Sequence, residues 1–198
     1  MKNDEKIIFR LAKIDDAEKL VEIYAPYVKN TNITFEYEVP IIDEFKQRIT
    51  KIMSKFPYIL ACIGDEIVGY TYASTFRERQ AYNWCVETSI YINDYINEKY
   101  QGRKIGEILY TKLEAILKLQ NITNLVASIT YPNPQSIAFH EKFNYKKIAH
   151  FTKCGYKQNC WYDMVFMEKM INKHETLAKE IIYLPDLDKN LVEKILQK

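Results

Sequence analysis

The chain has 198 residues, of which 47% are hydrophobic, 27% are charged and only 5 are glycine. These are ordinary proportions for one globular domain with a buried core, and they exclude a disordered, fibrous or repetitive protein. The formal net charge is +2 and the charges are interleaved, so no basic stripe predicts binding to nucleic acid or to a lipid surface, and a small ligand is favoured.

The cysteines and histidines do not have the spacing of a metal site. The four cysteines, Cys62, Cys85, Cys154 and Cys160, form no C-x-x-C pair, so no structural zinc is predicted. The start, MKNDEKIIFR, lacks a signal-peptide core, and no uncharged run is long enough to span a bilayer. We therefore expect a cytoplasmic protein with reduced thiols and no membrane contact.

The first part of the chain predicts a strand, two helices and a hairpin. A short strand over 7–12 precedes a helix with apolar positions from Ala17 to Val28, and a second helix spans Phe45 to Phe56 before Pro57 ends it. The β-rich runs YILACI and IVGYTYAS, separated by the turn residues Gly64-Asp65-Glu66, predict an antiparallel pair.

The middle of the chain predicts a strand and a long helix. Alternation from Cys85 to Ile92 indicates a strand that places Glu87 on the face opposite its apolar neighbours. Apolar residues from Ile105 to Leu117 recur at helical spacing over three turns. The segment YQGRKIG therefore precedes or opens a helix.

A strand over 125–130 follows, and then a helix with Asn133 as its N-cap and Pro134 at its first position. Two β runs, 146–152 and 161–167, predict a closing hairpin. The tail from 172 contains two short amphipathic segments, which we expect to be helical and to pack on this domain or on a second subunit.

Four features of this order suggest chemistry, and each has a plainer interpretation. YQGRKIG fits an anion site at a helix N-terminus, or a solvated helix start. Glu87 is a carboxylate among apolar residues, which suggests a functional group, but it could also be a surface residue of an edge strand. His140 could be a catalytic residue or a packing residue of its helix. Arg77 and Arg79 could clamp a carboxylate, or lie in solvent.

Taken in order, these segments resemble the GNAT N-acetyltransferases, and within them the phosphinothricin N-acetyltransferase branch that also acylates methionine sulfone and sulfoximine. FRERQAYNWCVETSIYI is similar to the branch signature, QGRKIG to the coenzyme A pyrophosphate loop, and PNPQSIAFHEKFNY and GYKQNCWYDMVFM to two later motifs. Thr34 and Phe35 match a shorter upstream motif. The resemblance covers residues 7 to about 171, so we expect an acetyltransferase domain over 1–171 and a helical extension over 172–198.

The resemblance implies an α/β (α+β) GNAT fold, in which a mixed, twisted sheet flanked by helices holds acetyl-CoA in a V-shaped opening between two parallel strands. It implies that Glu87 is the general base and that His140 is the acid for the departing thiolate. It implies cofactor contacts from Ile90, Tyr91, Ile92, Gln101, Gly102, Arg103, Lys104, Ile105, Gly106, Asn133 and Ser136. The acceptor, a small amino-acid-like amine, would meet Phe35, Arg77, Arg79 and Tyr82. The branch is typically homodimeric.

The main departure from the family pattern is Lys104, which stands where the pyrophosphate loop has its first defining glycine. Two other hypotheses stay open: a protein N-terminal acetyltransferase, and a non-catalytic CoA-binding protein with the same fold. Lys104 supports the second of these. The joint presence of Glu87, Asn133 and His140 supports a working small-molecule enzyme.

Overall fold

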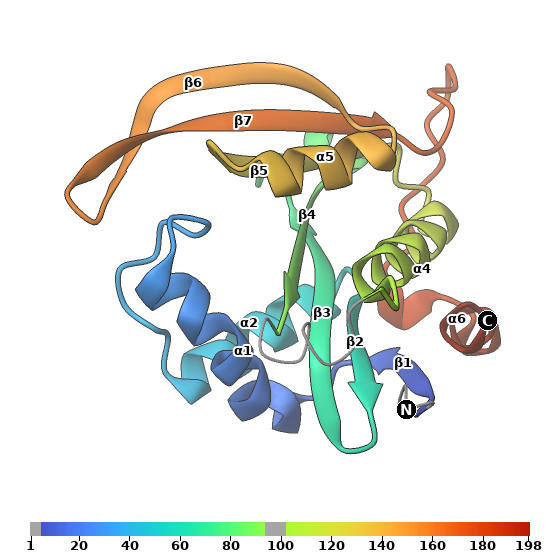
Figure 1. Ribbon diagram of the computed structural model, residues 1–198. Coiled ribbons are helices and arrows are strands. Elements are labelled where there is room, and N and C mark those ends of the chain that lie inside the picture. The colour runs from blue at the N-terminus through green and yellow to red at the C-terminus, as the bar shows by residue number, and fades with distance from the viewer. Residues whose placement is uncertain (1–4, 94–101) are drawn as a thin grey trace.

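The computed structural model describes residues 5–93 and 102–198 and contains a seven-stranded mixed sheet with helices on both faces (Figure 1). The strands are β1 (Ile7–Leu11), β2 (Tyr58–Ile63), β3 (Glu66–Thr75), β4 (Cys85–Ile92), β5 (Asn124–Tyr131), β6 (Lys146–Lys157) and β7 (Cys160–Met170). The helices are α1 (Ala17–Asn30), α2 (Ile42–Met53), α4 (Ile105–Leu119), α5 (Pro134–Lys142) and α6 (Lys189–Gln197). The predicted α/β class is confirmed.

The strand order across the sheet is β1-β2-β3-β4-β5-β7-β6. Neighbours are antiparallel except for β4 and β5, which are parallel. Two apolar clusters cover the two faces. One joins α4 to the sheet through side chains such as Leu109, Leu113 and Val86, and the other joins α1 and α2 through Leu20 and Ile49. Burial on both faces makes the centre of the sheet the core.

The parallel pair separates part-way along its length. The pairing of β4 with β5 runs only from Cys85 to Glu87 on one side and from Asn124 to Val126 on the other. Beyond that point β4 continues to Ile92 and β5 to Tyr131 without pairing to each other. The V-shaped opening that the family resemblance predicts is therefore present, and it begins immediately after Glu87.

The closing hairpin is longer than the sequence predicts. Its strands β6 and β7 meet at a two-residue turn, Gln158 and Asn159, and both residues have positive φ values, 51° and 59°. This left-handed turn suits the twist of a hairpin and so allows pairing beyond the expected ends. Figure 1 shows the hairpin extending past the rest of the sheet, toward the same side as the loop between α1 and α2.

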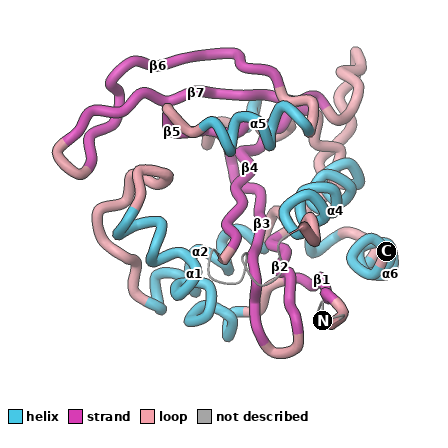
Figure 2. The backbone as a smooth tube through the Cα atoms, in the orientation of Figure 1, coloured by secondary structure: helices cyan, strands magenta, loops and turns pink. Residues whose placement is uncertain are grey.

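The tail corrects one expectation and confirms another. Residues 171–183 form no helix, and Figure 2 draws them as a loop, whereas α6 forms as predicted. The loop's backbone bonds to other elements instead: Gln120 Nε2 donates to the Ile182 carbonyl at 2.9 Å, and Trp84 Nε1 donates to the Lys179 carbonyl at 2.7 Å. The Ile182 N–H also donates to the Gln120 carbonyl at 3.2 Å, so it is not available for helical pairing.

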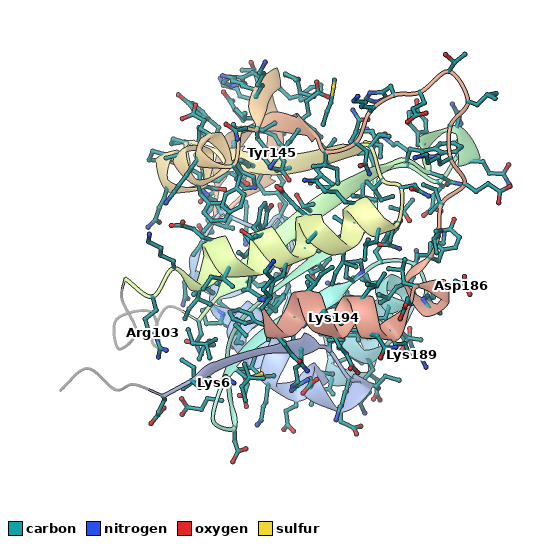
Figure 3. All side chains as sticks on the ribbon, turned by 90° about the vertical axis from the view of Figure 1, so that its right-hand side faces the viewer. Lys6, Arg103, Tyr145, Asp186, Lys189 and Lys194 are labelled. Carbon is teal, nitrogen blue, oxygen red and sulfur yellow. The ribbon has the colours of Figure 1, made fainter. Side chains whose placement is uncertain are left out.

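The helix α6 packs on its own chain, against α4 and β1, as Figure 3 shows from the side. Its Val192 and Leu196 belong to the same core cluster as α4. Lys112 of α4 donates from Nζ to the Ile195 carbonyl at 2.8 Å, which places a cation at the C-terminal end of α6. Among the described residues, no helix has both the length and the apolarity needed to cross a bilayer.

Candidate active site

Glu87 occupies the last position of β4 that pairs with β5, where the opening between the two strands begins. Because side chains alternate along a strand, Val86 and Thr88 are buried on the α4 face, and Glu87 lies half-buried on the opposite face. β4 is an interior strand, flanked by β3 and β5, so the interpretation of Glu87 as an edge-strand surface residue is wrong. The carboxylate is fixed beside the opening by the middle of the sheet.

A second carboxylate lies on the same face. Val126 pairs with Glu87 on one side and with Glu168 of β7 on the other, so both side chains project in one direction. Burial raises the pKa of the nearby Cys85 thiol to about 11, and the negative charges of Glu168 and Glu87 add to the rise. This face of the sheet therefore holds a negative charge that suits an amine.

A cleft of about 490 Å³ lies at the N-terminus of α4. Residues from the predicted loop, from β4 and from α5 line it together: Ile90, Ile92, Gly102, Lys104, Ile105, Gly106, Asn133 and Ser136. Gln101 is outside the described residues. Arg103 is not part of this lining, and its guanidinium donates to the Glu5 carbonyl at 2.7 Å, toward the N-terminal strand (Figure 3).

The loop at this cleft adopts left-handed backbone conformations. Gly102 has a φ of 84° and Lys104 a φ of 56°. Lys104 is the N-cap of α4, and its carbonyl accepts the first helical hydrogen bond, from Ile108 N at 3.0 Å. A Cβ on Gly106 would lie 3.5 Å from both Ile90 and Phe139, so this helix start runs close to β4. Helical N–H groups and the Lys104 charge therefore face one side of the cleft.

A narrower cavity of about 70 Å³ continues from this cleft between β4 and β5. The two share Ile33, Ile90, Asn133 and Ser136. Asn133 is the predicted N-cap of α5, and its Oδ1 accepts from Ser136 N at 3.0 Å. Tyr91 also borders the inner cavity, but its ring packs on the other face of the sheet.

His140 borders the inner cavity and is almost completely buried, with 4% of its surface exposed. Its Nδ1 lies 2.8 Å from the Ser136 carbonyl, which can only accept, so Nδ1 carries a hydrogen. Its Nε2 lies 2.9 Å from the hydroxyl of Tyr110, and that hydroxyl lies 3.0 Å from Thr88 Oγ1. Burial lowers the pKa of His140, although the hydrogen bond to Ser136 opposes this. The ring is neutral at pH 7.

The four residues predicted to meet the acceptor come from two loops. Phe35 lies in the loop between α1 and α2 and contacts Tyr162 of β7, with ring centroids 6.5 Å apart. Arg77 and Arg79 are exposed in the loop before β4, where the Arg77 guanidinium lies 5.0 Å from the Phe76 ring. Tyr82, in the same loop, borders a different cavity of about 480 Å³ that the tail helps to line.

The comparisons with known proteins identify the family. The family model described as Acetyltransferase (GNAT) domain matches residues 9–166, most of the chain. The chain belongs to the GNAT acetyltransferases. It is 26% identical to a phosphinothricin N-acetyltransferase of Streptomyces viridochromogenes over 81% of this chain and 85% of the relative. It is 25% identical to an L-methionine sulfoximine/L-methionine sulfone acetyltransferase of Pseudomonas aeruginosa, over 80% and 91%.

Solved structures agree with these relatives. A GNAT superfamily phosphinothricin acetyltransferase from Sinorhizobium meliloti, solved with acetyl-CoA, superposes with a TM-score of 0.79 and 29% identity, covering 91% of this chain and 96% of that one. The predicted resemblance is confirmed, and the chain is an acetyl-CoA-dependent acyltransferase.

The cleft of this acetyltransferase has the chemistry that its cofactor requires. A pyrophosphate needs donors and positive charge, which the α4 N-terminus and Lys104 supply, and the neighbouring Ile90, Ile92 and Phe139 offer apolar walls to the pantetheine arm. The inner cavity continues from this cleft between β4 and β5, and Thr88, the residue after Glu87, lines it.

Sequence reasoning missed the partners of His140 in this acetyltransferase. Tyr110 lies among the apolar positions of α4, where a tyrosine is a normal core residue, and Thr88 is one of the alternating residues of β4. Neither shows any local signal. The one available hint was a hydroxyl at a position that the helical spacing marks as buried, because a buried tyrosine hydroxyl usually has a hydrogen-bond partner.

Proposed function

We propose that this enzyme moves the acetyl group of acetyl-CoA to the amino group of a small amino-acid-like acceptor, of the phosphinothricin, methionine sulfone or methionine sulfoximine type. The observation that carries the proposal is the position of Glu87, the last residue of β4 that pairs with β5, where the opening between these strands begins. The names of the relatives support this acceptor class.

Glu87 is proposed to be the general base. An α-amino group has a pKa of about 7.7–8.0, so most of it is protonated at neutral pH and cannot attack a thioester. The cofactor supplies an acetyl group activated as a thioester. The enzyme then has to hold the amine near that group, accept one proton at Glu87, and keep the reacting atoms aligned. The Ile90 N–H is proposed to polarise the acetyl carbonyl.

The role of His140 as the acid for the departing thiolate stays a prediction, and the geometry restricts how it would act. The Nδ1 hydrogen is used by the Ser136 carbonyl, and Nε2 faces Tyr110. Because the neutral ring carries no hydrogen on Nε2, His140 would first have to take up a proton there. It would then give that proton to the Tyr110 oxygen while the Tyr110 hydroxyl gives its own hydrogen to the thiolate. We propose that the two side chains act as one unit, in which His140 orients the hydroxyl.

Glu87→Gln tests the base, with Glu168→Gln as the matched control on the same face of the sheet. We expect Glu87→Gln to reduce kcat/KM about 100-fold or more and to do so most strongly at low pH, with unchanged acetyl-CoA binding. Glu168→Gln should change kcat/KM less than about threefold. Equal effects of the two substitutions, at every pH, would contradict the assignment.

The acceptor is tested by thiol release over a panel containing phosphinothricin, methionine sulfone, methionine sulfoximine, the standard amino acids and a peptide with a free N-terminus. Turnover of the modified amino acids supports the proposal. Turnover of the peptide alone would make the chain a protein N-terminal acetyltransferase. Acetyl-CoA binding without turnover of any amine would make it a non-catalytic binding protein.

We further propose that the enzyme is a cytoplasmic homodimer. The family branch is typically dimeric, and the hairpin at the edge of the sheet exposes large apolar side chains: Ile148, Phe151 and Trp161 are each more than half exposed. Apolar groups on an edge strand favour pairing with another chain. Sedimentation at several protein concentrations tests this, and a monomer at micromolar concentration would contradict it.

A further inference from the structure

The turn end of the β6–β7 hairpin is fastened to the loop between α1 and α2. We call residues 154–161 the hairpin tip and residues 31–41 the α1–α2 loop. Lys157 donates from Nζ to the Thr34 carbonyl at 2.7 Å, and the Tyr37 hydroxyl donates to the Tyr156 carbonyl. Next to these contacts, Gln158 Nε2 donates to the Lys29 carbonyl in α1 at 3.3 Å. These contacts join segments more than a hundred residues apart in the sequence.

Phe35 fills the space between the two segments. A Cβ placed on Gly155 of the hairpin tip would lie 2.2 to 2.8 Å from three atoms of the Phe35 ring, closer than atoms can approach. Gly155 therefore allows the ring to lie directly on the hairpin backbone, and the same ring contacts Tyr162. Phe35, a predicted acceptor contact, is thus held from the hairpin side.

The α1–α2 loop is also anchored from its inner side. The Tyr24 hydroxyl of α1 lies 2.7 Å from Thr34 Oγ1. Arg48 of α2 makes two bonds to the Glu36 carboxylate, at 2.7 and 3.1 Å. Because α1 and α2 pack on the sheet, the loop connects the sheet to the hairpin tip. On the face that carries Glu87, α1 and α2 pack against the sheet, and the loop between them is joined to the hairpin tip.

Lys157 is the charged residue in this fastening, and its burial is unusual. Only 3% of its surface is exposed, and its described hydrogen bond goes to one neutral carbonyl. Burial lowers the pKa of Lys157, and the nearby Glu36 charge offsets part of this. A lysine held in this way is costly to bury, and a neutral side chain would pack there at lower cost. The arrangement therefore requires a reason other than stability.

We propose that Lys157 is a positioning residue that holds the α1–α2 loop closed against the hairpin tip, so that the acceptor site admits small free amines and excludes polypeptides. The inference rests on the proposed function, and it adds which residue sets the size of the acceptor. Lys157 touches neither the cofactor cleft nor Glu87, so its effect passes through Thr34 and Phe35. A loop free to move away from the hairpin tip would hold a small acceptor less firmly.

Lys157→Met tests the proposal, with Lys146→Met, an exposed lysine at the other end of β6, as the matched control. Methionine keeps most of the length and removes the donor. We expect Lys157→Met to raise KM for the small acceptor about five- to twentyfold, to change kcat by less than about threefold and to change acetyl-CoA affinity by less than about threefold, because the loop adds only Ile33 to the cleft lining that α4, β4 and α5 provide. Lys146→Met should match the wild type in all three.

Two further measurements separate positioning from general damage. Hydrogen exchange should become faster in residues 31–37 and 154–160 of Lys157→Met, and stay unchanged in α4 and β5. Lys157→Arg, which keeps a donor, should restore part of the KM. The turnover of a peptide amine, relative to that of the small acceptor, should be higher in Lys157→Met than in the wild type.

The outcomes are distinct. If Lys157→Met matches Lys146→Met in KM and in exchange, or if KM and kcat change together with acetyl-CoA affinity, the proposal is wrong. Gly155→Ala, which displaces Phe35 without touching the charge, provides an independent route: it should raise KM in the same way, and an unchanged KM there would also overturn the proposal. If the wild-type enzyme turns over no amino acid at all, the proposed function fails. Hydrogen exchange in the α1–α2 loop of Lys157→Met, compared with the wild type, then decides whether Lys157 holds this loop against the hairpin tip.

Discussion

Lys104 is expected to lower the stability of the free enzyme and to strengthen cofactor binding, and substitution by glycine should reveal both effects. The residue has a φ of 56° at the N-cap of α4, in the left-handed region that glycine adopts without cost. Its ammonium also lies at the cleft of the pyrophosphate loop, where it is exposed. Lys104→Gly should therefore stabilise the free enzyme and weaken cofactor binding at the same time.

The sizes of both effects follow from the conformation and the exposure. A non-glycine residue in the left-handed region costs about 1–2 kcal/mol, and glycine returns about 0.4–1 kcal/mol through the unfolded chain, which leaves a gain of about 0.5–1 kcal/mol. For a chain of this length the melting temperature should rise by about 1–4 °C. Loss of one exposed charge near a phosphate is worth about 0.2–1 kcal/mol, so acetyl-CoA affinity should fall up to about fivefold.

Thermal unfolding of the free enzyme and calorimetric titration with acetyl-CoA measure the two effects separately. Lys104→Gln is the control, because it removes the charge and keeps a side chain in the left-handed conformation. It should lose affinity as Lys104→Gly does, without the rise in melting temperature, and both losses should shrink at high salt. A glycine variant that melts no higher than the glutamine variant would refute the conformational argument, and unchanged affinity in both would refute the electrostatic one.

Two further predictions concern the buried polar groups of the core. Because burial lowers the pKa of His140, the unfolded chain takes up a proton below about pH 6.5 and the folded chain does not, so the free energy of unfolding should fall with decreasing pH by up to about 1.4 kcal/mol per unit. The free energy of unfolding, measured by urea unfolding at several pH values between 7 and 5, should change less with pH in His140→Gln than in the wild type. Equal changes with pH in the two proteins would contradict this. Lys112→Met removes the bond to the Ile195 carbonyl and the cation 4.9 Å from the Phe9 ring, so it should lower the free energy of unfolding by about 1–2 kcal/mol, whereas the exposed Lys118→Met should lower it by less than about 0.5 kcal/mol.

Local patterns were sufficient to predict most of the elements around the site. The apolar spacing from Ile105 predicted α4, alternation predicted β4, and the Asn133-Pro134 pair predicted the start of α5, because each signal depends only on neighbours in the sequence. The same reasoning failed for the segment around Leu177, which is 86% exposed and not helical. Its helical spacing was real, but its backbone bonds to distant residues such as Trp84 and Gln120, and spacing does not reveal such bonds.

The candidate site depended on the order of motifs and not on any single one. Nothing in the residues of β4 indicates that its pairing with β5 stops at Glu87, and only the family resemblance predicted an opening there. The Tyr110 and Lys157 contacts were beyond sequence reasoning for a different reason. Each joins a core or hairpin residue to a partner far along the chain, and such pairs depend on how the elements pack after they form.

The tail lies outside the region that the family model matches, but its helix α6 packs on α4, whose first turn lies at the cofactor loop. The core cluster places Leu196 of α6 with Leu113 of α4, and Lys112 joins the two helices by a hydrogen bond. Because a helix is a rigid connection between its ends, contacts along α4 help to fix the helix whose first turn begins at Lys104 and Ile105. Loosening α6 should therefore weaken acetyl-CoA binding without touching the cleft. Loosening the hairpin tip should act first on the α1–α2 loop, so it should weaken the binding of the acceptor more than that of acetyl-CoA.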